Sequence, residues 1–229
     1  MPRIWTHFYF LCLLIFIQGC GDKENICSES YPNGQVMFEV HCDSWTGDYQ
    51  GEMKTYNPEG RLIKRSFYVD DILEDTLFSY YPETGLIKEI SEMKGGKKDG
   101  FSATYYPDGV TPFSECDYIE DIRFGKYRRF RPDGTPLATF TFAFNKRHGG
   151  FAVFRSSGMP YLTGEFVMDQ IDGEIRLFND EGAVIDAQDW APGQEQNPEE
   201  MGYQSTLTIT IPNEGKAFIK GDSVWIQTH

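Results

Sequence analysis

The chain has 229 residues, of which 15% are aromatic and 23 are glycine, and its 35 acidic residues outnumber its 21 lysines and arginines, for a net charge of −14. This composition suits strands joined by tight turns. The negative charge excludes a nucleic-acid backbone as the ligand, because phosphate binding needs a basic surface, and it favours attraction to a basic partner.

The N-terminus has the features of a targeting segment. Arg3 precedes a continuous apolar run, Phe8–Ile17, that is too short to span a bilayer as a permanent helix. The run leads into Ile17-Gln18-Gly19-Cys20, which resembles a bacterial lipobox. We therefore expect residues 1–19 to be a lipoprotein signal peptide, with an ordinary cleaved signal as the alternative. Acyl chains on Cys20 would anchor the protein in a membrane.

Residues 20–30 are expected to form the lipidated tether. Gly21–Asn25 is short and rich in charge, and it resembles the surface-export signals of some bacterial lipoproteins. The outer membrane is favoured as the location, and the choice between its periplasmic and its surface face stays open. The mature chain is expected to be extracytoplasmic on either face.

Three cysteines remain after Cys12 is removed with the signal and Cys20 is acylated. Cys27 and Cys42 flank Gly34, so a hairpin at Gly34 would bring them together, and an oxidising compartment would allow a disulfide. Cys116 is then expected to be a buried thiol. Cys27, His41 and Cys42 lack the spacing of metal ligands, so no metal site is predicted.

A repeat with a period of 24 to 26 residues organises most of the chain, and its glycines are Gly34, Gly60, Gly85, Gly109, Gly134, Gly158 and Gly182. A period held over seven copies indicates a repeat architecture. Six copies also have a leading position nine or ten residues before this glycine, which is Gly51, Asp75, Gly100, Gly125, Gly149 or Gly173. Five residues after the leading position there is always an aromatic residue, Tyr56, Tyr80, Tyr105, Phe130, Phe154 or Phe178.

The repeat predicts a β-hairpin. Turns such as Tyr106-Pro107-Asp108-Gly109 place proline where φ is near −65° and glycine where φ is positive. Strand-like flanks surround each turn, and a second, looser connection leads to the next hairpin. Because a lone hairpin is marginally stable, the copies must stack side by side.

The stacked hairpins are expected to form one long, open, antiparallel sheet over residues 31–187, with a C-terminal β cap. The recurring aromatics would lie as a ladder on one face. Apolar residues also occupy the opposite face of the leading strand, at Met53, Leu77, Tyr127, Phe151 and Ile175. Both faces are therefore partly hydrophobic, and one of them is a candidate surface for a partner.

This pattern resembles the MORN repeat family, in particular the variant repeats of YwqK-type antitoxin-like proteins. The matching stretches are Gly100–Gly109, Gly125–Gly134, Gly149–Gly158 and Gly173–Gly182, with the Gly51 copy close to them. The resemblance implies an all-β repeat array and an immunity or antitoxin role. The acidic charge opposes the lipid binding suggested for some members of the family.

The period stops after Ala183. Residues 188–204 read as a polar linker that is rich in proline, glycine and glutamate. Thr206–Ile211 alternates with period two, and further strand-like runs follow after the turn Pro212-Asn213-Glu214-Gly215. Residues 205–229 are therefore expected to be a β-hairpin cap that covers the last edge of the sheet, or a small separate module.

No catalytic signature is present, so we expect neither an enzyme nor a cofactor. The function predicted is a membrane-anchored lipoprotein whose sheet binds or scaffolds a protein. One alternative is an antitoxin that neutralises a basic toxin, and another is a glycan-binding envelope protein. The candidate contact residues are the ladder aromatics Tyr56, Tyr105, Phe130, Phe154 and Phe178, for which a packing role within the sheet is the competing interpretation.

Overall fold

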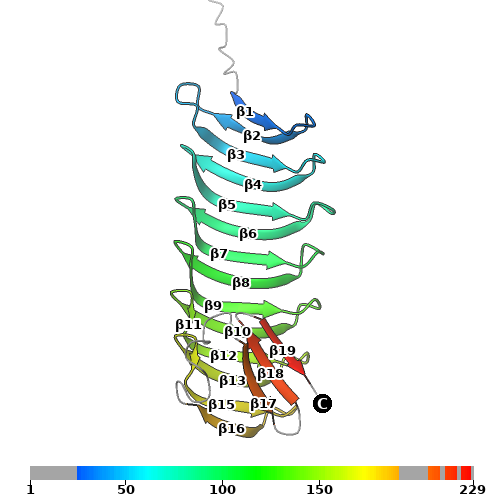
Figure 1. Cartoon of the computed structure of the whole chain (residues 1–229), viewed down its shortest axis with the longest axis vertical. Helices are drawn as coiled ribbons and strands as arrows, with labels where there is room; N and C mark the ends of the chain where they lie inside the picture. Colours follow the sequence, from blue (N-terminus) through cyan, green and yellow to red (C-terminus); the bar gives the residue numbers. More distant parts are fainter. Residues whose placement is uncertain (1–24, 191–205, 212–214, 221–222, 228–229) are drawn as a thin grey trace, which may run out of the picture.

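The protein is a long, open, all-β ladder. The computed structural model describes residues 25–190, 206–211, 215–220 and 223–227. Sixteen strands form one antiparallel sheet whose neighbours follow chain order, and three more form a second sheet (Figure 1). The open antiparallel meander predicted from the repeat is thus confirmed. Within the described residues, no helix is long and apolar enough to cross a membrane.

The long sheet contains β1 (Ile26–Ser30), β2 (Val36–Cys42), β3 (Tyr49–Tyr56), β4 (Leu62–Val69), β5 (Ile72–Tyr80), β6 (Ile87–Lys94), β7 (Lys97–Tyr105), β8 (Pro112–Ile119), β9 (Ile122–Phe130), β10 (Pro136–Ala143), β11 (Lys146–Arg147), β12 (Gly149–Phe154), β13 (Pro160–Val167), β14 (Gln170–Ile171), β15 (Gly173–Phe178) and β16 (Val184–Trp190). The second sheet contains β17 (Thr206–Ile211), β18 (Gly215–Lys220) and β19 (Ser223–Gln227). The sheet begins inside the predicted tether, at Ile26, and runs three residues into the predicted linker, to Trp190.

The seven glycine turns close seven hairpins. In the turn at Gly109, the glycine N–H donates to the carbonyl of Tyr106 at 2.9 Å, and φ of the glycine is 69°. All seven repeat glycines have positive φ, between 69° and 85°, a region that other residues enter only with strain. The need for positive φ in every hairpin turn explains why glycine recurs with a period of 24 to 26 residues.

Each hairpin also has a β-bulge directly at its turn. In six hairpins the register shifts where the leading strand reaches its ladder aromatic, as at Tyr56 and Tyr105, and in the first hairpin it shifts at Ser30, so the return strand has one extra residue. A bulge bends its strand and increases the local twist. Seven bulges lie at the same place along the ladder, whose strands are bowed in Figure 1.

The second connections are tighter than the sequence predicted. Five of the six are two-residue turns with φ positive at both positions: Asp70-Asp71, Gly95-Gly96, Glu120-Asp121, Phe144-Asn145 and Met168-Asp169. Such turns match the twist of the flanking strands. The leading positions that follow also have positive φ, and Asp75 adopts 63° where the other copies have glycine.

The side chains of these turns join one repeat to the previous one. Asp121 accepts a hydrogen bond from the Lys98 N–H at 2.8 Å and donates its own N–H to the Lys98 carbonyl at 2.8 Å. The same reciprocal pair joins Asp71 to Tyr49, Asn145 to Arg123 and Asp169 to Arg147. These turns therefore join each repeat to the previous one through side-chain as well as backbone hydrogen bonds.

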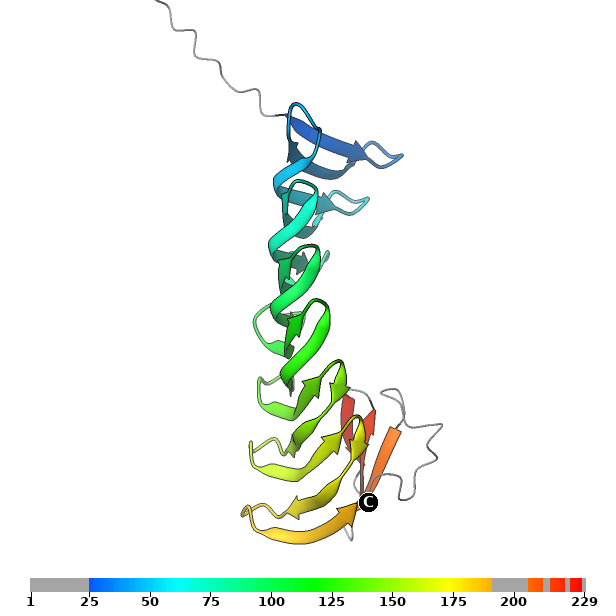
Figure 2. The same ribbon diagram turned by 90° about the vertical axis from the view of Figure 1, so that its left-hand side faces the viewer.

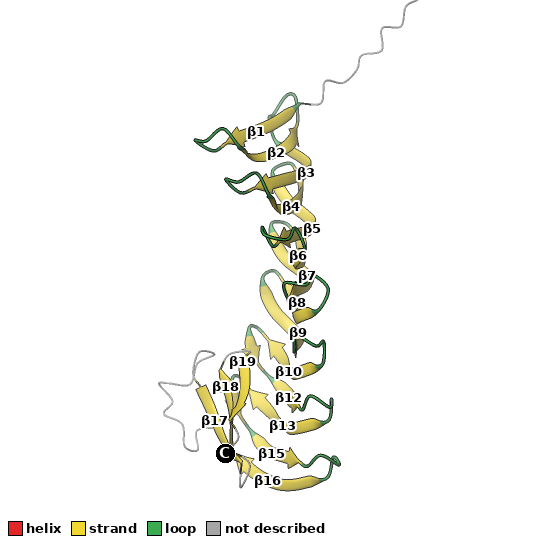
Figure 3. Cartoon of the chain, turned by 90° about the vertical axis from the view of Figure 1, so that its right-hand side faces the viewer, coloured by secondary structure: helices red, strands yellow, loops and turns green. Residues whose placement is uncertain are grey.

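The two faces of the sheet differ. We call the face that bears Met53, Tyr127, Phe151 and Ile175 the covered face, because β17–β19 lies against its C-terminal half in both side views (Figures 2 and 3). The opposite face is called the open face. Side chains alternate between the two faces along each strand.

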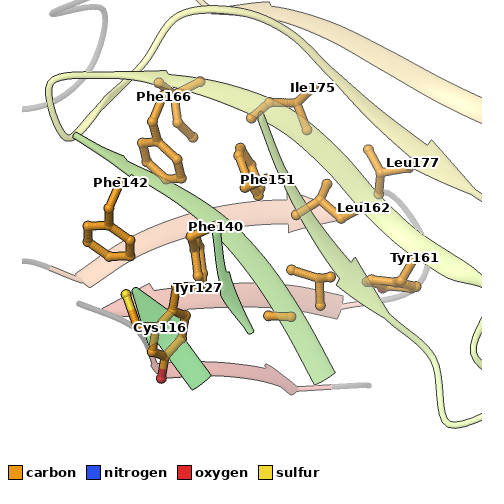
Figure 4. Packing of buried hydrophobic residues seen from close by; sticks show 13 residues of the cluster. Cys116, Tyr127, Phe140, Phe142, Phe151, Tyr161, Leu162, Phe166, Ile175 and Leu177 are labelled. Carbon is orange, nitrogen blue, oxygen red and sulfur yellow. The ribbon is translucent and has the colours of Figure 1, made fainter. Parts of the chain in front are cut away.

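The hydrophobic core lies under the second sheet. On the covered face, strands β4, β6 and β7 carry Ser66, Ser91 and Ser102, whereas β9, β10 and β12 carry Tyr127, Phe140 and Phe151 at corresponding positions. Phe140 and Leu162 are fully buried, and Figure 4 shows them in one cluster with Phe166 and Leu177. The sheet thus becomes apolar on this face where β17–β19 covers it.

The predicted cap differs from the observed one in its position. β17–β19 forms a three-stranded sheet of its own and does not pair with β16. It covers a face of the ladder, where most apolar area is available for burial, and leaves the β16 edge unpaired within the described residues.

Candidate functional site: the open face of the sheet

The ladder aromatics all lie on the open face, at one register position near the glycine turns. Each is half buried, and apolar residues of the return strands lie opposite them, such as Pro112 opposite Tyr105 and Pro160 opposite Phe154. The members of this ladder are Tyr56, Tyr80, Tyr105, Phe130, Phe154 and Phe178. Their position as a single row is what the repeat predicted.

Hydrogen bonds between repeats fix the backbone of this ladder. In four repeats the residue after a ladder aromatic donates to the carbonyl of the next ladder aromatic: Tyr81 Oη to Tyr105 at 2.7 Å, and Tyr106 Oη to Phe130 at 2.9 Å, are two of them. The guanidiniums of Arg131 and Arg155 donate to the carbonyls of Phe154 and Phe178 in the other two. Tyr31, which follows Ser30 in the first hairpin, donates to the carbonyl of Tyr56. This regularity favours a packing role for the ladder.

Tyr56 is further immobilised through its hydroxyl group, which donates to Glu39 Oε1 at 2.7 Å. Burial, together with the bond to Glu39, raises the pKa of Tyr56 to about 12. Burial and the nearby Glu115 raise the pKa of Tyr105 as well. Both phenols therefore stay protonated at neutral pH, and that of Tyr56 donates its proton to Glu39.

The more exposed rings of the open face lie at the other end of the strands, next to the two-residue turns. Phe67, Phe101, Phe124 and Phe144 are 40%, 37%, 44% and 71% exposed, and Val69, Ile72, Ile119 and Ile122 beside them are exposed too. Phe124 and Phe144 meet edge to face at 6.5 Å. Large apolar side chains that gather on one surface mark an interaction site more often than scattered ones do.

Carboxylates alternate with these rings across the strands. Phe67 on β4 pairs with Glu52 on β3 and Glu74 on β5, and Asp117 on β8 pairs with Phe101 on β7 and Phe124 on β9. We call this margin of the open face the acid–phenylalanine margin. It presents apolar area and negative charge together, which suits a partner with aliphatic and cationic groups.

The acid–phenylalanine margin is not predictable from the repeat, because its residues are not constant among the copies. The position that holds Phe101 holds Glu52, Thr76, Lys126, Gly150 and Glu174 in the other repeats. The sequence signal that could have found this margin is a phenylalanine at a position where the other copies have a different residue. Strand alternation would then place that phenylalanine on the open face.

The remaining predicted site residues are cysteines. Cys27 and Cys42 are joined in a disulfide that ties β1 to β2, with Cα atoms 5.9 Å apart, and Cys116 is buried. Cys20 lies outside the described residues. Among the described residues, no group of three or more His, Cys, Asp or Glu is arranged to hold a metal ion.

Comparison with known proteins identifies no family. The sequence matches no family model and no curated protein. Among solved structures, the chain is similar to the glycosylation associate protein (Gap123) complex from Streptococcus agalactiae, with 13% identity and a TM-score of 0.30. That match covers 48% of this chain and 19% of the other, so the chain spans about a fifth of the length of its neighbour.

Proposed function

We propose that this protein is a membrane-anchored envelope lipoprotein of the MORN-like repeat type, whose open face binds a protein partner. The observation that carries the proposal is the difference between the two faces. The second sheet lies against one face only, while the other presents exposed phenylalanines alternating with carboxylates. The lipobox-like Cys20, six residues before β1, supports anchoring at the N-terminal end of the ladder.

The charge of the chain favours a basic partner. With a net charge of −14, association with a basic protein would be accelerated at low salt and weakened at high salt. This is also the specific observation in favour of the second candidate function, an immunity-type protein that neutralises a basic toxin at the envelope. A basic toxin that the protein inhibits would select this second candidate.

Anchoring is tested by fractionating cells that produce the wild-type chain or Cys20→Ala. The wild-type chain is expected in the membrane fraction, and Cys20→Ala in the soluble extracytoplasmic fraction or as unprocessed precursor. Equal distribution of mature protein in both strains would contradict the lipid anchor.

Binding is tested by affinity capture from detergent-solubilised envelopes at low and high salt, with the wild-type chain and a Phe67→Ser/Phe124→Ser variant as baits. A basic envelope protein that is retained by the wild-type bait and lost with the variant is the expected result. Equal retention by both baits would contradict the use of the open face. Failure to retain any protein would point to the glycan alternative, for which a glycan array is the direct assay.

A further inference from the structure

One constellation on the acid–phenylalanine margin combines a carboxylate with a ring on each side. Asp117 lies directly opposite Phe101 on β7 and directly opposite Phe124 on β9. Residues that pair across antiparallel strands share a face, and their Cβ atoms lie about 4.5–5.5 Å apart. The carboxylate of Asp117 is therefore flanked by two phenylalanines on the open face.

The constellation is open to solvent. Asp117, Phe101 and Phe124 are all exposed, and Phe144 extends the apolar surface through its edge contact with Phe124. A second carboxylate, Glu92, accepts a hydrogen bond from the Phe101 N–H at 2.9 Å. No Lys, Arg or His among the described residues forms an ion pair with Asp117.

Elsewhere on the open face, an arginine of the chain itself binds a carboxylate and a phenylalanine ring at the same time. Arg65 lies over the ring of Phe78 at 5.5 Å, and its Nε and Nη2 atoms lie 2.6 and 2.5 Å from Glu52 Oε1. The hydrogen bond to Glu52 raises the pKa of Arg65. One arginine side chain thus contacts a carboxylate and a phenylalanine ring together, on strands β3–β5, and Asp117 lies on β8 of the same sheet. At Asp117 the carboxylate and the rings are present, and no arginine within the described part of the chain forms an ion pair with it.

We propose that Asp117, with Phe101 and Phe124 on either side, is the docking site for an arginine side chain of a protein partner. This deepens the proposed function and rests on it, because it names the chemistry of the partner and its place on the open face. A guanidinium is planar, lies flat on aromatic rings and donates to a carboxylate at the same time. The net charge of −14 favours the approach of a basic segment and disfavours anionic ligands.

The test measures binding of a fluorescein-labelled peptide of alternating arginine and leucine to the full chain, purified in detergent, by fluorescence anisotropy at low salt. Its ligand control is the same peptide with citrulline in place of arginine, which keeps the shape and removes the charge. The protein variants are Asp117→Asn and Phe101→Leu/Phe124→Leu. The matched control is Glu165→Gln, because Glu165 occupies the corresponding position of another repeat, is exposed, and pairs with Gly150 in place of a phenylalanine.

The proposal predicts that Asp117→Asn and Phe101→Leu/Phe124→Leu each weaken arginine-peptide binding about fivefold, the scale of an exposed ion pair or ring contact. Glu165→Gln is expected to change it less than about twofold, since it alters only the net charge. The citrulline peptide is expected not to bind.

Three results would overturn the site: equal weakening by Asp117→Asn and Glu165→Gln, equal binding of the citrulline peptide, or no binding of the arginine peptide to the wild-type chain. Affinity capture from envelopes distinguishes failure of the Asp117 site from failure of the proposed function. A partner captured by the wild-type bait and lost with Phe67→Ser/Phe124→Ser would keep the proposed function while the peptide assay rejects Asp117 as the contact.

Discussion

Replacing Gly109 by alanine tests how the glycine turns of neighbouring repeats fit against each other. Gly109 has φ of 69°, and a Cβ atom there would lie 2.6 Å from Leu86 Cβ and 3.2 Å from the Ile87 backbone nitrogen, both in the preceding repeat. Gly134 is the matched control, because it has φ of 80° and its nearest neighbour would be Thr111 Cγ2 at 4.0 Å.

The expected loss of stability for each alanine variant follows from the environments of the two glycines. Positive φ costs a non-glycine residue about 1–2 kcal/mol, and the smaller entropy of the unfolded alanine chain offsets about 0.4–1 kcal/mol of that. Gly134→Ala should therefore destabilise by about 1 kcal/mol. Gly109→Ala should cost about 1–3 kcal/mol more through overpacking, because Leu86 Cβ and the Ile87 backbone nitrogen of the preceding repeat must move.

The assay is thermal unfolding of residues 21–229, followed by circular dichroism. For a chain of this size, each kcal/mol shifts Tm by about 2–4 °C, so Gly109→Ala should melt several degrees below Gly134→Ala. Gly109→Val should melt lower still. Equal Tm values for the two alanine variants would refute the close contact between turns, and wild-type values for both would refute the need for positive φ.

Three further predictions concern the acidic turns, the ion pairs between repeats and the core. The carboxylate of Asp108 accepts hydrogen bonds from Thr111, and that of Asp133 from Thr135, so both pKa values lie below the ordinary 3.8. Their stabilising contribution is complete above the pKa of the unfolded chain and is lost as pH falls through the lower folded value, so Asp108→Asn/Asp133→Asn should lose less Tm than wild type between pH 5 and pH 2. A parallel acid profile would contradict this. Asp169→Ala breaks a buried pair with Arg147 and should cost about 3–5 kcal/mol in urea unfolding, whereas Asp121→Ala at the equivalent exposed turn should cost about 1 kcal/mol; equal losses would reject the role of burial. Phe140→Ala should cost about 3–5 kcal/mol and Phe124→Ala on the open face less than about 1 kcal/mol, and the reverse order would show that the two faces are wrongly assigned.

The sequence predicts the ladder well because its local rules repeat. A glycine at positive φ closes all seven hairpins, a proline precedes it in five of them, and an aromatic stands at a fixed offset in six. Strand alternation then places Tyr56, Tyr105 and Phe154 on one face and Tyr127 and Phe151 on the other. Seven copies of the same local pattern leave little freedom for another arrangement.

The connections between successive hairpins were wrongly expected to be loose, because their sequences lack the residues typical of tight turns. A two-residue hairpin turn is usually signalled by Asn-Gly or Gly-Gly, and only Gly95-Gly96 carries such a signal here. In pairs such as Glu120-Asp121, the strain of positive φ is offset by the hydrogen bonds that Asp121 forms with Lys98, and these depend on residues 23 positions away.

The position of the second sheet and the acid–phenylalanine margin were also beyond the sequence. Thr206–Ile211 is readable as a strand, but nothing local tells whether it pairs with an edge or covers a face. The change from Ser102 to Tyr127 and Phe140 on the covered face is the pattern that specifies the second arrangement. This change can be recognised only when the register of the strands is known.

In the proposed function the open face binds a partner, while the covered face is occupied by the chain's own second sheet. The most direct measurement places a photo-crosslinking amino acid at Phe124 on the open face, or at Leu162 on the covered face, and irradiates intact cells. We expect a crosslink to a basic envelope protein from position 124 and, from position 162, only crosslinks within the chain. The absence of an intermolecular product from position 124, or the same product from position 162, would contradict the account.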